Sequence, residues 1–179
     1  MKNIILLFSL LFTVALTSCE KDEYTEFYSD NRPEIPVTFP GTTTYGFNPY
    51  ITHSISGGGN IEFTLAIPEN SGRTIKEITK IVAGSTSINA GTVTSADVAD
   101  KTGKVAVVSY NNATPIPVNS TTATFTTTLE EFKSKTEEAA KTDDNKLVKD
   151  GGEIAFMFLI TLDNDQTIIP VQVRVRLTE

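Results

Sequence analysis

The single cysteine of this 179-residue chain, Cys19, is the residue with the most distinctive chemistry. A lone cysteine has no partner for an intramolecular disulfide, so its presence in an exported chain needs another explanation. Cys19 directly follows the apolar run of residues 4–16, which only Ser9 and Thr13 interrupt, and directly precedes a charged run. Acylation of its sulfur is a reaction that would use a thiol at such a boundary.

The apolar run itself has the properties of a signal peptide. Lys2 supplies a positive charge ahead of it, and Thr17 and Ser18 are small residues at the cleavage position. Residues 4–16 are too few to cross a bilayer, which takes about 20 apolar residues. A buried core helix is the alternative, but such a helix would carry a polar stripe, which is missing here. We therefore predict a signal peptide over residues 1–18.

The four residues Leu16-Thr17-Ser18-Cys19 resemble the lipobox of bacterial lipoproteins. The resemblance implies that the chain is cleaved before Cys19, that the sulfur of Cys19 is diacylated and that its new amino group is acylated. Two or more acyl chains give a stable anchor, whereas one gives marginal binding. The expected membrane contact is therefore a lipid anchor at Cys19.

The charged run after the cysteine, Glu20-Lys21-Asp22-Glu23, resembles the export signal of Bacteroidota lipoproteins. In that signal a lysine followed by two acidic residues directs the protein to the outer face of the outer membrane. A solvated, charged tether is the plainer interpretation of such a run. The resemblance implies an outer-membrane protein that faces the cell exterior, and the periplasmic face stays open as the alternative.

Length and charge limit the remaining possibilities. Removal of residues 1–18 leaves enough chain for one domain with a core. The formal net charge is −7 and there is no basic cluster, which argues against nucleic acid as a partner. Residues 19–36 are polar, contain two prolines and show no period, so we expect a flexible tether there and the folded domain over 37–179.

The hydrophobic pattern predicts strands along most of the domain. Residues 61–67 alternate strictly between apolar and polar, which is typical of a half-buried strand. Residues 153–162 are apolar on both faces and should lie centrally, and residues 167–179 should return as the second strand of a hairpin with alternate side chains inward. Residues 74–83 fit either a helix or a strand, and their β-branched residues favour a strand.

One helix is expected, because Thr128 begins a capping box with Glu131. It should continue through residue 141. Its inward face would carry Leu129, Phe132 and either Ala139 or Ala140. About seven short strands, turn signals between them and one short helix predict a mainly β fold, specifically a single antiparallel Ig-like β-sandwich.

Catalytic and metal-binding patterns are missing from the sequence. His53 is the only histidine and has no catalytic partner, so a half-exposed strand position is the expected role. The acidic segments 143–153 and 163–174 fail the EF-hand pattern, although a weak irregular calcium site stays an alternative. No phosphate-binding loop or nucleophile elbow occurs. We predict a protein that is not an enzyme and has no cofactor and no metal, while distant paired carboxylates stay open.

The segment 41–50 suggests recognition instead. Tyr45, Phe47 and Tyr50 lie close together there, with Asn48 among them. Aromatic faces beside short polar side chains suit sugars, whose apolar ring faces are edged by hydroxyls. The alternative is that these aromatics belong to the hydrophobic core, and the absence of tryptophan from the chain weakens the sugar interpretation.

Taken whole, the chain resembles the small surface lipoproteins of Bacteroidota that accompany glycan-uptake machinery. The specific resemblance covers residues 16–23. It implies a non-catalytic outer-membrane surface lipoprotein that acts as an accessory or glycan-binding module, with a glycan or an outer-membrane transporter complex as partner. The alternative is a structural or adhesive module that contacts protein partners through a sheet edge or face. The outward-facing row Gln172, Arg174 and Arg176 is the candidate surface for that role.

Overall fold

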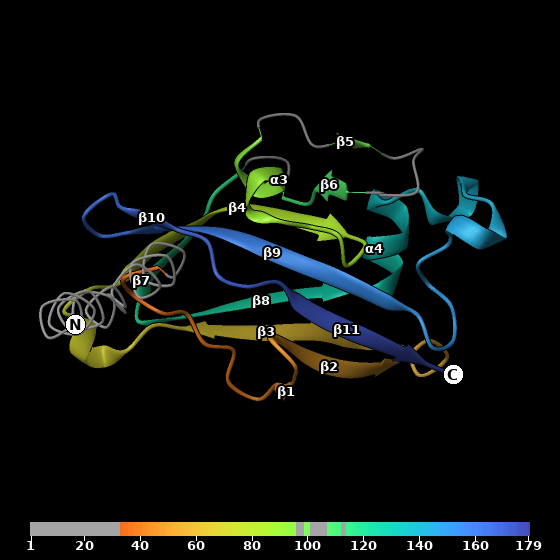
Figure 1. Ribbon diagram of the computed structural model, residues 1–179, viewed down its shortest axis with the longest axis horizontal. Helices are drawn as coiled ribbons and strands as arrows, with labels where there is room; N and C mark the ends of the chain where they lie inside the picture. Colours follow the sequence, from red (N-terminus) through yellow and green to blue (C-terminus); the bar gives the residue numbers. More distant parts are fainter. Residues whose placement is uncertain (1–32, 96–98, 101–106, 112–113) are drawn as a thin grey trace, which may run out of the picture. The chain divides into compact units, whose positions relative to one another are not determined.

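The computed structural model of the chain describes residues 33–95, 99–100, 107–111 and 114–179. Cys19, the charged run after it and the expected signal peptide lie outside these residues. Ile35–Glu179 form one compact unit, which is mainly β and contains two sheets (Figure 1). The mainly β prediction is therefore confirmed.

The larger sheet is mixed, with the spatial order β1, β2, β11, β9, β4, β6 and β5. These strands are β1 (Thr43–Tyr45), β2 (Asn48–Ser54), β11 (Val173–Thr178), β9 (Glu153–Leu162), β4 (Ile75–Gly84), β6 (Val107–Ser109) and β5 (Ala99–Asp100). Two further short strands join it: β10 (Thr167–Ile168) pairs with β9, and β7 (Ile116–Ser120) pairs with β4. The smaller sheet consists of β3 (Asn60–Ala66) and β8 (Thr122–Thr128).

The central position predicted for residues 153–162 is confirmed. β9 lies between β4 and β11 and is apolar on both faces. One face, with Phe156 and Phe158, belongs to the main core, and the other, with Ala155 and Met157, packs in a second cluster with Val93. Val93 lies on the short helix α3 (Ala90–Thr94), which covers that outer face.

The main core fills the space between the two sheets, and Phe156 lies at its centre. Its ring centroid is 5.7 Å from that of Phe63 on β3 and 5.6 Å from that of Phe125 on β8. The rings of Tyr110 and Phe132 lie at 5.4 Å and 5.9 Å. Offset and edge-on contacts of this kind add to the free energy of burial.

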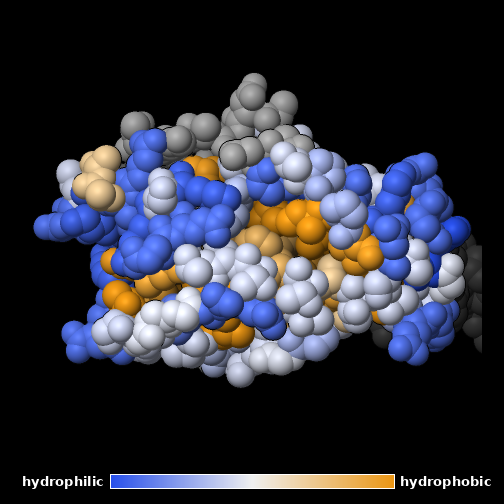
Figure 2. Space-filling view, turned by 180° about the vertical axis from the view of Figure 1, so that it is seen from behind, coloured by the Kyte–Doolittle hydropathy of each residue, from blue (hydrophilic) through white to orange (hydrophobic). Residues whose placement is uncertain are grey.

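Figure 2 shows the molecule from behind, where apolar residues gather along a hollow between polar borders.

The prediction of wholly antiparallel pairing is wrong. β2 and β11 are parallel, with Tyr50 beside Arg174 and Leu177 beside His53. The cause is that β2 and β11 are not joined by a hairpin, because after Ser54 the chain crosses to the smaller sheet and begins β3. The direction of pairing between strands so far apart in sequence is not encoded in their alternation. The described residues also form eleven strands, more than the seven or so expected.

The predicted hairpin at the end of the chain forms, but Pro170 divides its return strand in two. β10 pairs with the end of β9 and β11 with its beginning. Proline lacks the N–H that a continuous strand would donate. The expected inward alternation consequently holds within β11 and fails before it, where Val171 is 49% exposed.

Strand β4 confirms the strand interpretation of residues 74–83. The helix predicted after Thr128 is α4 (Leu129–Lys135), whose N-cap is Thr128, with Oγ1 accepting the N–H of Glu131 at 3.1 Å. It is shorter than expected, since Glu137 adopts a left-handed backbone conformation (φ +54°) that ends the helix. Ala139 and Ala140 lie instead in the 3-10 helix η2 (Glu138–Ala140), where both are exposed, so the expectation that either packs inward is wrong.

Candidate functional site

The aromatic segment 41–50 folds into the β1–β2 hairpin at one edge of the larger sheet. Its turn consists of Gly46 and Phe47, and Gly46 supplies the positive φ (+67°) that such turns require. The side chain of Phe47 is 94% exposed at the turn, so it does not belong to the core. Asn48 and Tyr50 are two positions apart on β2 and therefore face the same side of the sheet.

Tyr50 lies against an arginine that the sequence places more than a hundred residues away. The guanidinium carbon of Arg176 on β11 is 3.9 Å from the centroid of the Tyr50 ring. This cation–π contact follows from the parallel register, which places Tyr50 beside Arg174 and Thr52 beside Arg176 on adjacent strands. The candidate glycan-binding tyrosine and the candidate protein-contact arginines thus form one surface.

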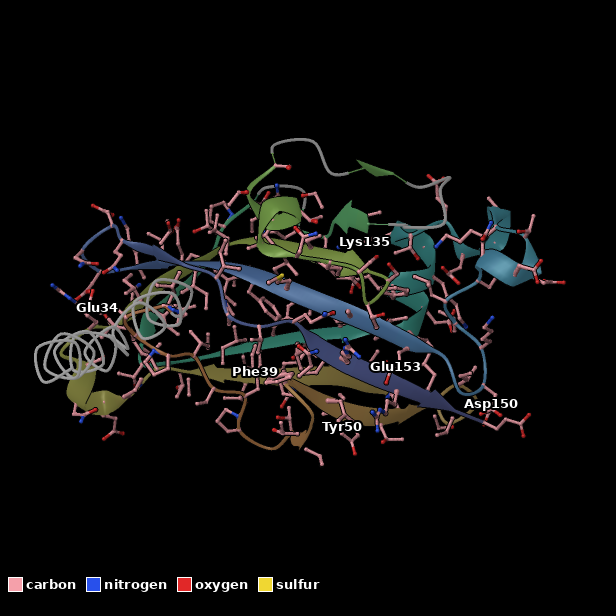
Figure 3. All side chains as sticks on the ribbon, in the orientation of Figure 1. Glu34, Phe39, Tyr50, Lys135, Asp150 and Glu153 are labelled. Atoms are coloured by element: carbon pink, nitrogen blue, oxygen red, sulfur yellow. The ribbon has the colours of Figure 1, made fainter. Side chains whose placement is uncertain are left out.

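Glu153 lies at the start of β9 (Figure 3) and binds both arginines. Arg174 Nη1 donates to Glu153 Oε2 at 3.2 Å, and Arg176 Nε donates to Glu153 Oε1 at 2.8 Å. The three side chains are between 26% and 36% exposed, so these charge-assisted bonds are partly protected from solvent. We call the whole set the aromatic–arginine patch. It consists of Phe47, Asn48, Tyr50, Glu153, Arg174 and Arg176.

Two buried polar atoms beside the patch have no hydrogen-bond partner among the described residues. They are Nε of Arg174 and Oε1 of Gln172, which are neighbours in the outward-facing row. Gln172 is fixed through its other amide atom, since Nε2 donates to the carbonyl oxygen of Thr86 at 3.1 Å. Unpaired buried polar atoms are rare in folded proteins.

The structure places the predicted site residues as follows. Asn48 and Tyr50 share one face of the sheet, Phe47 lies in the turn before them, and the backbone register pairs Tyr45 with Asn48. The side chain of Tyr45 lies outside what the structure describes. Sequence reasoning did not single out Glu153, whose only signal was its position at the start of the central strand.

The candidate metal and catalytic residues have other surroundings. His53 lies on β2, and its buried Nε2 has no hydrogen-bond partner among the described residues. Asp165 pairs with Lys76 at 2.6 Å. Asp143 pairs with Lys146 at 2.7 Å, and this hydrogen bond lowers the pKa of the Asp143 carboxyl. In the part of the chain that the structure describes, no three His, Cys, Asp or Glu residues are grouped so as to hold a metal ion.

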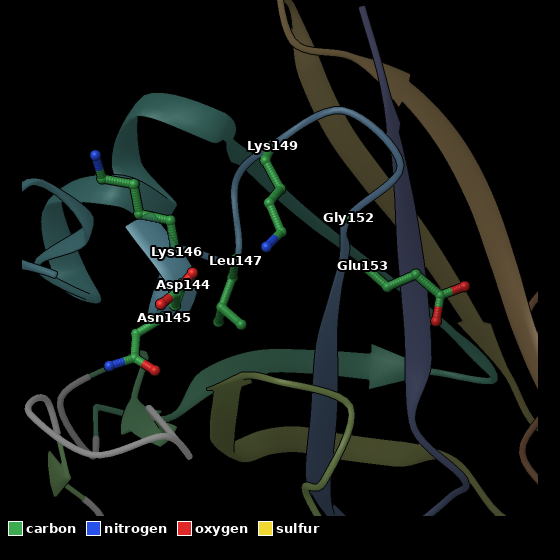
Figure 4. Close-up of a pocket in the computed structure, with 7 residues that line it drawn as sticks. All are labelled: Asp144, Asn145, Lys146, Leu147, Lys149, Gly152 and Glu153. Carbon is green, nitrogen blue, oxygen red and sulfur yellow. The ribbon is translucent and has the colours of Figure 1, made fainter. Parts of the chain in front are cut away.

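A second concave site lies beyond the start of β9, with a volume of about 450 Å³. It is lined by Asp144, Asn145, Lys146, Leu147, Lys149, Gly152 and Glu153. Leu147 and Lys149 point into it, whereas the carboxylate of Glu153 points away from it (Figure 4). It has no aromatic side chain, so it lacks the stacking surface that the patch provides. We therefore take the aromatic–arginine patch as the candidate site.

Comparison with known proteins found no matching family model, no matching curated protein and no matching solved structure. Among the helices of the described residues, none has the length and apolar character that a membrane crossing requires.

Proposed function

We propose that this protein is a non-catalytic lipoprotein of the outer-membrane surface and serves as an accessory or glycan-binding module of a polysaccharide-uptake system. The observation that carries the binding part of the proposal is the exposure of Phe47 at the turn that leads into β2, the strand of Asn48 and Tyr50. Its ring is 94% exposed, so a ligand can stack on it. Sugar rings present an apolar face to such a side chain and hydroxyls to an amide such as that of Asn48.

The location rests on residues outside the described part of the chain. The lipobox-like sequence that ends at Cys19 and the charged run 20–23 support an acylated anchor and export to the cell surface. A domain tethered by residues 19–36 would extend away from the membrane and present its binding face to extracellular glycans or to a transporter complex.

We further propose that the sandwich is Ig-like in architecture. The support is that two sheets face each other over one aromatic core and that the chain passes from one sheet to the other between β7 and β8. The parallel pairing of β2 with β11 joins a strand near the beginning of the domain to its last strand.

A protein-contact function is the second candidate, and a specific observation favours it. Within the described residues, β8 pairs only with β3, so its other edge has no neighbouring strand. Thr122, Thr124 and Thr126 are its exposed residues, and no charge or proline protects this edge against strand addition. A partner could pair with β8 without using the aromatic–arginine patch.

The two functions are separated by a glycan-binding screen of the full-length protein in detergent, against an array of neutral and acidic polysaccharides. Phe47→Ala should weaken binding at least tenfold, and Tyr50→Ala should weaken it as well, whereas Val171→Ala, an exposed apolar control, should leave it unchanged. Circular dichroism melting curves check that each variant is folded. Absence of binding to every polysaccharide would refute the glycan-binding function and leave the β8 edge as the surface to test.

A further inference from the structure

Charge is unevenly distributed over the aromatic–arginine patch. The patch has two guanidinium groups, on Arg174 and Arg176, against the single carboxylate of Glu153, in a chain whose formal net charge is −7. We propose that the glycan bound at this patch is acidic and places a carboxylate or a sulfate group against the arginines. This inference rests on the proposed glycan-binding function and adds the class of ligand to it.

The guanidinium groups are held in place before any ligand arrives. Arg176 lies on the ring of Tyr50 at 3.9 Å and donates from Nε to Glu153 at 2.8 Å. Arg174 donates from Nη1 to the second oxygen of the same carboxylate at 3.2 Å. An arginine fixed in this way loses little side-chain entropy on binding, and its planar fork matches the oxygens of a carboxylate or a sulfate.

Partial burial strengthens this preference for an anion. The side chains of Arg174 and Glu153 are 26% and 28% exposed, so their charges are screened less than those of fully exposed residues. Both arginines bind the one carboxylate of Glu153. Among the described residues that form it, the patch therefore has more positive than negative charge.

The test compares charged and neutral forms of the same polysaccharide backbone. Full-length protein in detergent is titrated calorimetrically with polygalacturonate and with its methyl ester, and in a second arm with dextran sulfate and dextran. We expect at least tenfold tighter binding of the charged form in one of the two arms, and that arm identifies the group. Arg174→Gln should reduce this preference severalfold, and Lys76→Gln, which removes an exposed lysine on β4, should not.

Three results would overturn this inference. Equal binding of the charged and neutral forms would refute the acidic ligand and leave glycan binding intact, whereas absence of binding in all four titrations and on the array would refute glycan binding itself. A preference for the charged form that survives both Arg174→Gln and Arg176→Gln but disappears with Lys149→Gln would place the anion in the cavity lined by residues 144–153. Arg174→Lys separates charge from geometry, since a retained charge without the planar fork should keep only part of the preference.

Discussion

Removal of one partner from a buried ion pair should strongly destabilise this domain. Glu138 and Lys141 form an ion pair in which the two side chains are only 6% and 5% exposed. Oε2 of Glu138 also accepts the backbone N–H groups of Leu147 (2.9 Å) and Val148 (3.1 Å). One carboxylate thus fixes the segment that follows α4 and the loop that precedes β9.

Replacing Glu138 by alanine should destabilise the domain by about 3–5 kcal/mol, because the ammonium group of Lys141 is left buried without its partner and two backbone N–H groups lose their acceptor. For a domain of this size, each kcal/mol corresponds to about 2–4 °C, so the melting temperature should fall by roughly 6 to 20 °C. Urea unfolding followed by circular dichroism measures the change in the free energy of unfolding.

Two controls make this experiment decisive. Glu130→Ala removes the carboxylate of an exposed ion pair on α4 and should change the stability by less than about 1 kcal/mol. The double variant Glu138→Gln with Lys141→Met removes both charges and keeps one acceptor, so it should recover most of the loss. A loss for Glu138→Ala no larger than that for Glu130→Ala would show that the buried pair does not hold this segment, and the reasoning would fail.

Two further results are expected. The pKa of the Glu131 carboxyl lies below its ordinary value of 4.5, mainly because Lys135 donates a hydrogen bond to it and also because Thr127 does. Glu131 therefore stabilises the folded state above pH 4.5, and this stability is lost as the pH falls through the lowered pKa. Urea unfolding between pH 6 and pH 2.5 should therefore show a shallower acid decline for Glu131→Gln than for the native protein, and identical slopes would contradict this assignment. Cys19→Ser should abolish metabolic labelling by palmitate and move the protein out of the membrane fraction, and retention there without label would refute the lipid anchor.

Part of the candidate site follows from the local sequence. The Gly46-Phe47 turn with alternating residues on either side brings Asn48 and Tyr50 to one face, because side chains two positions apart in a strand share a face. The alternation in residues 173–178 likewise predicts that Arg174 and Arg176 face outward. Nothing in either segment shows that the two faces are the same face, since this depends on β2 and β11 being neighbours.

Local patterns in the sequence were therefore sufficient for the strand β9 at the centre of the larger sheet, the N-cap of α4 at Thr128 and the hairpin at the end of the chain. These features depend on periodicity and on hydrogen bonds between residues close in sequence. Only the tertiary structure decided that β2 pairs in parallel with β11, because that pairing joins segments about 120 residues apart and is selected by burial of the whole core. The same pairing places Arg176 on the ring of Tyr50 and Glu153 between two arginines, and so creates the patch from residues that no local pattern connects.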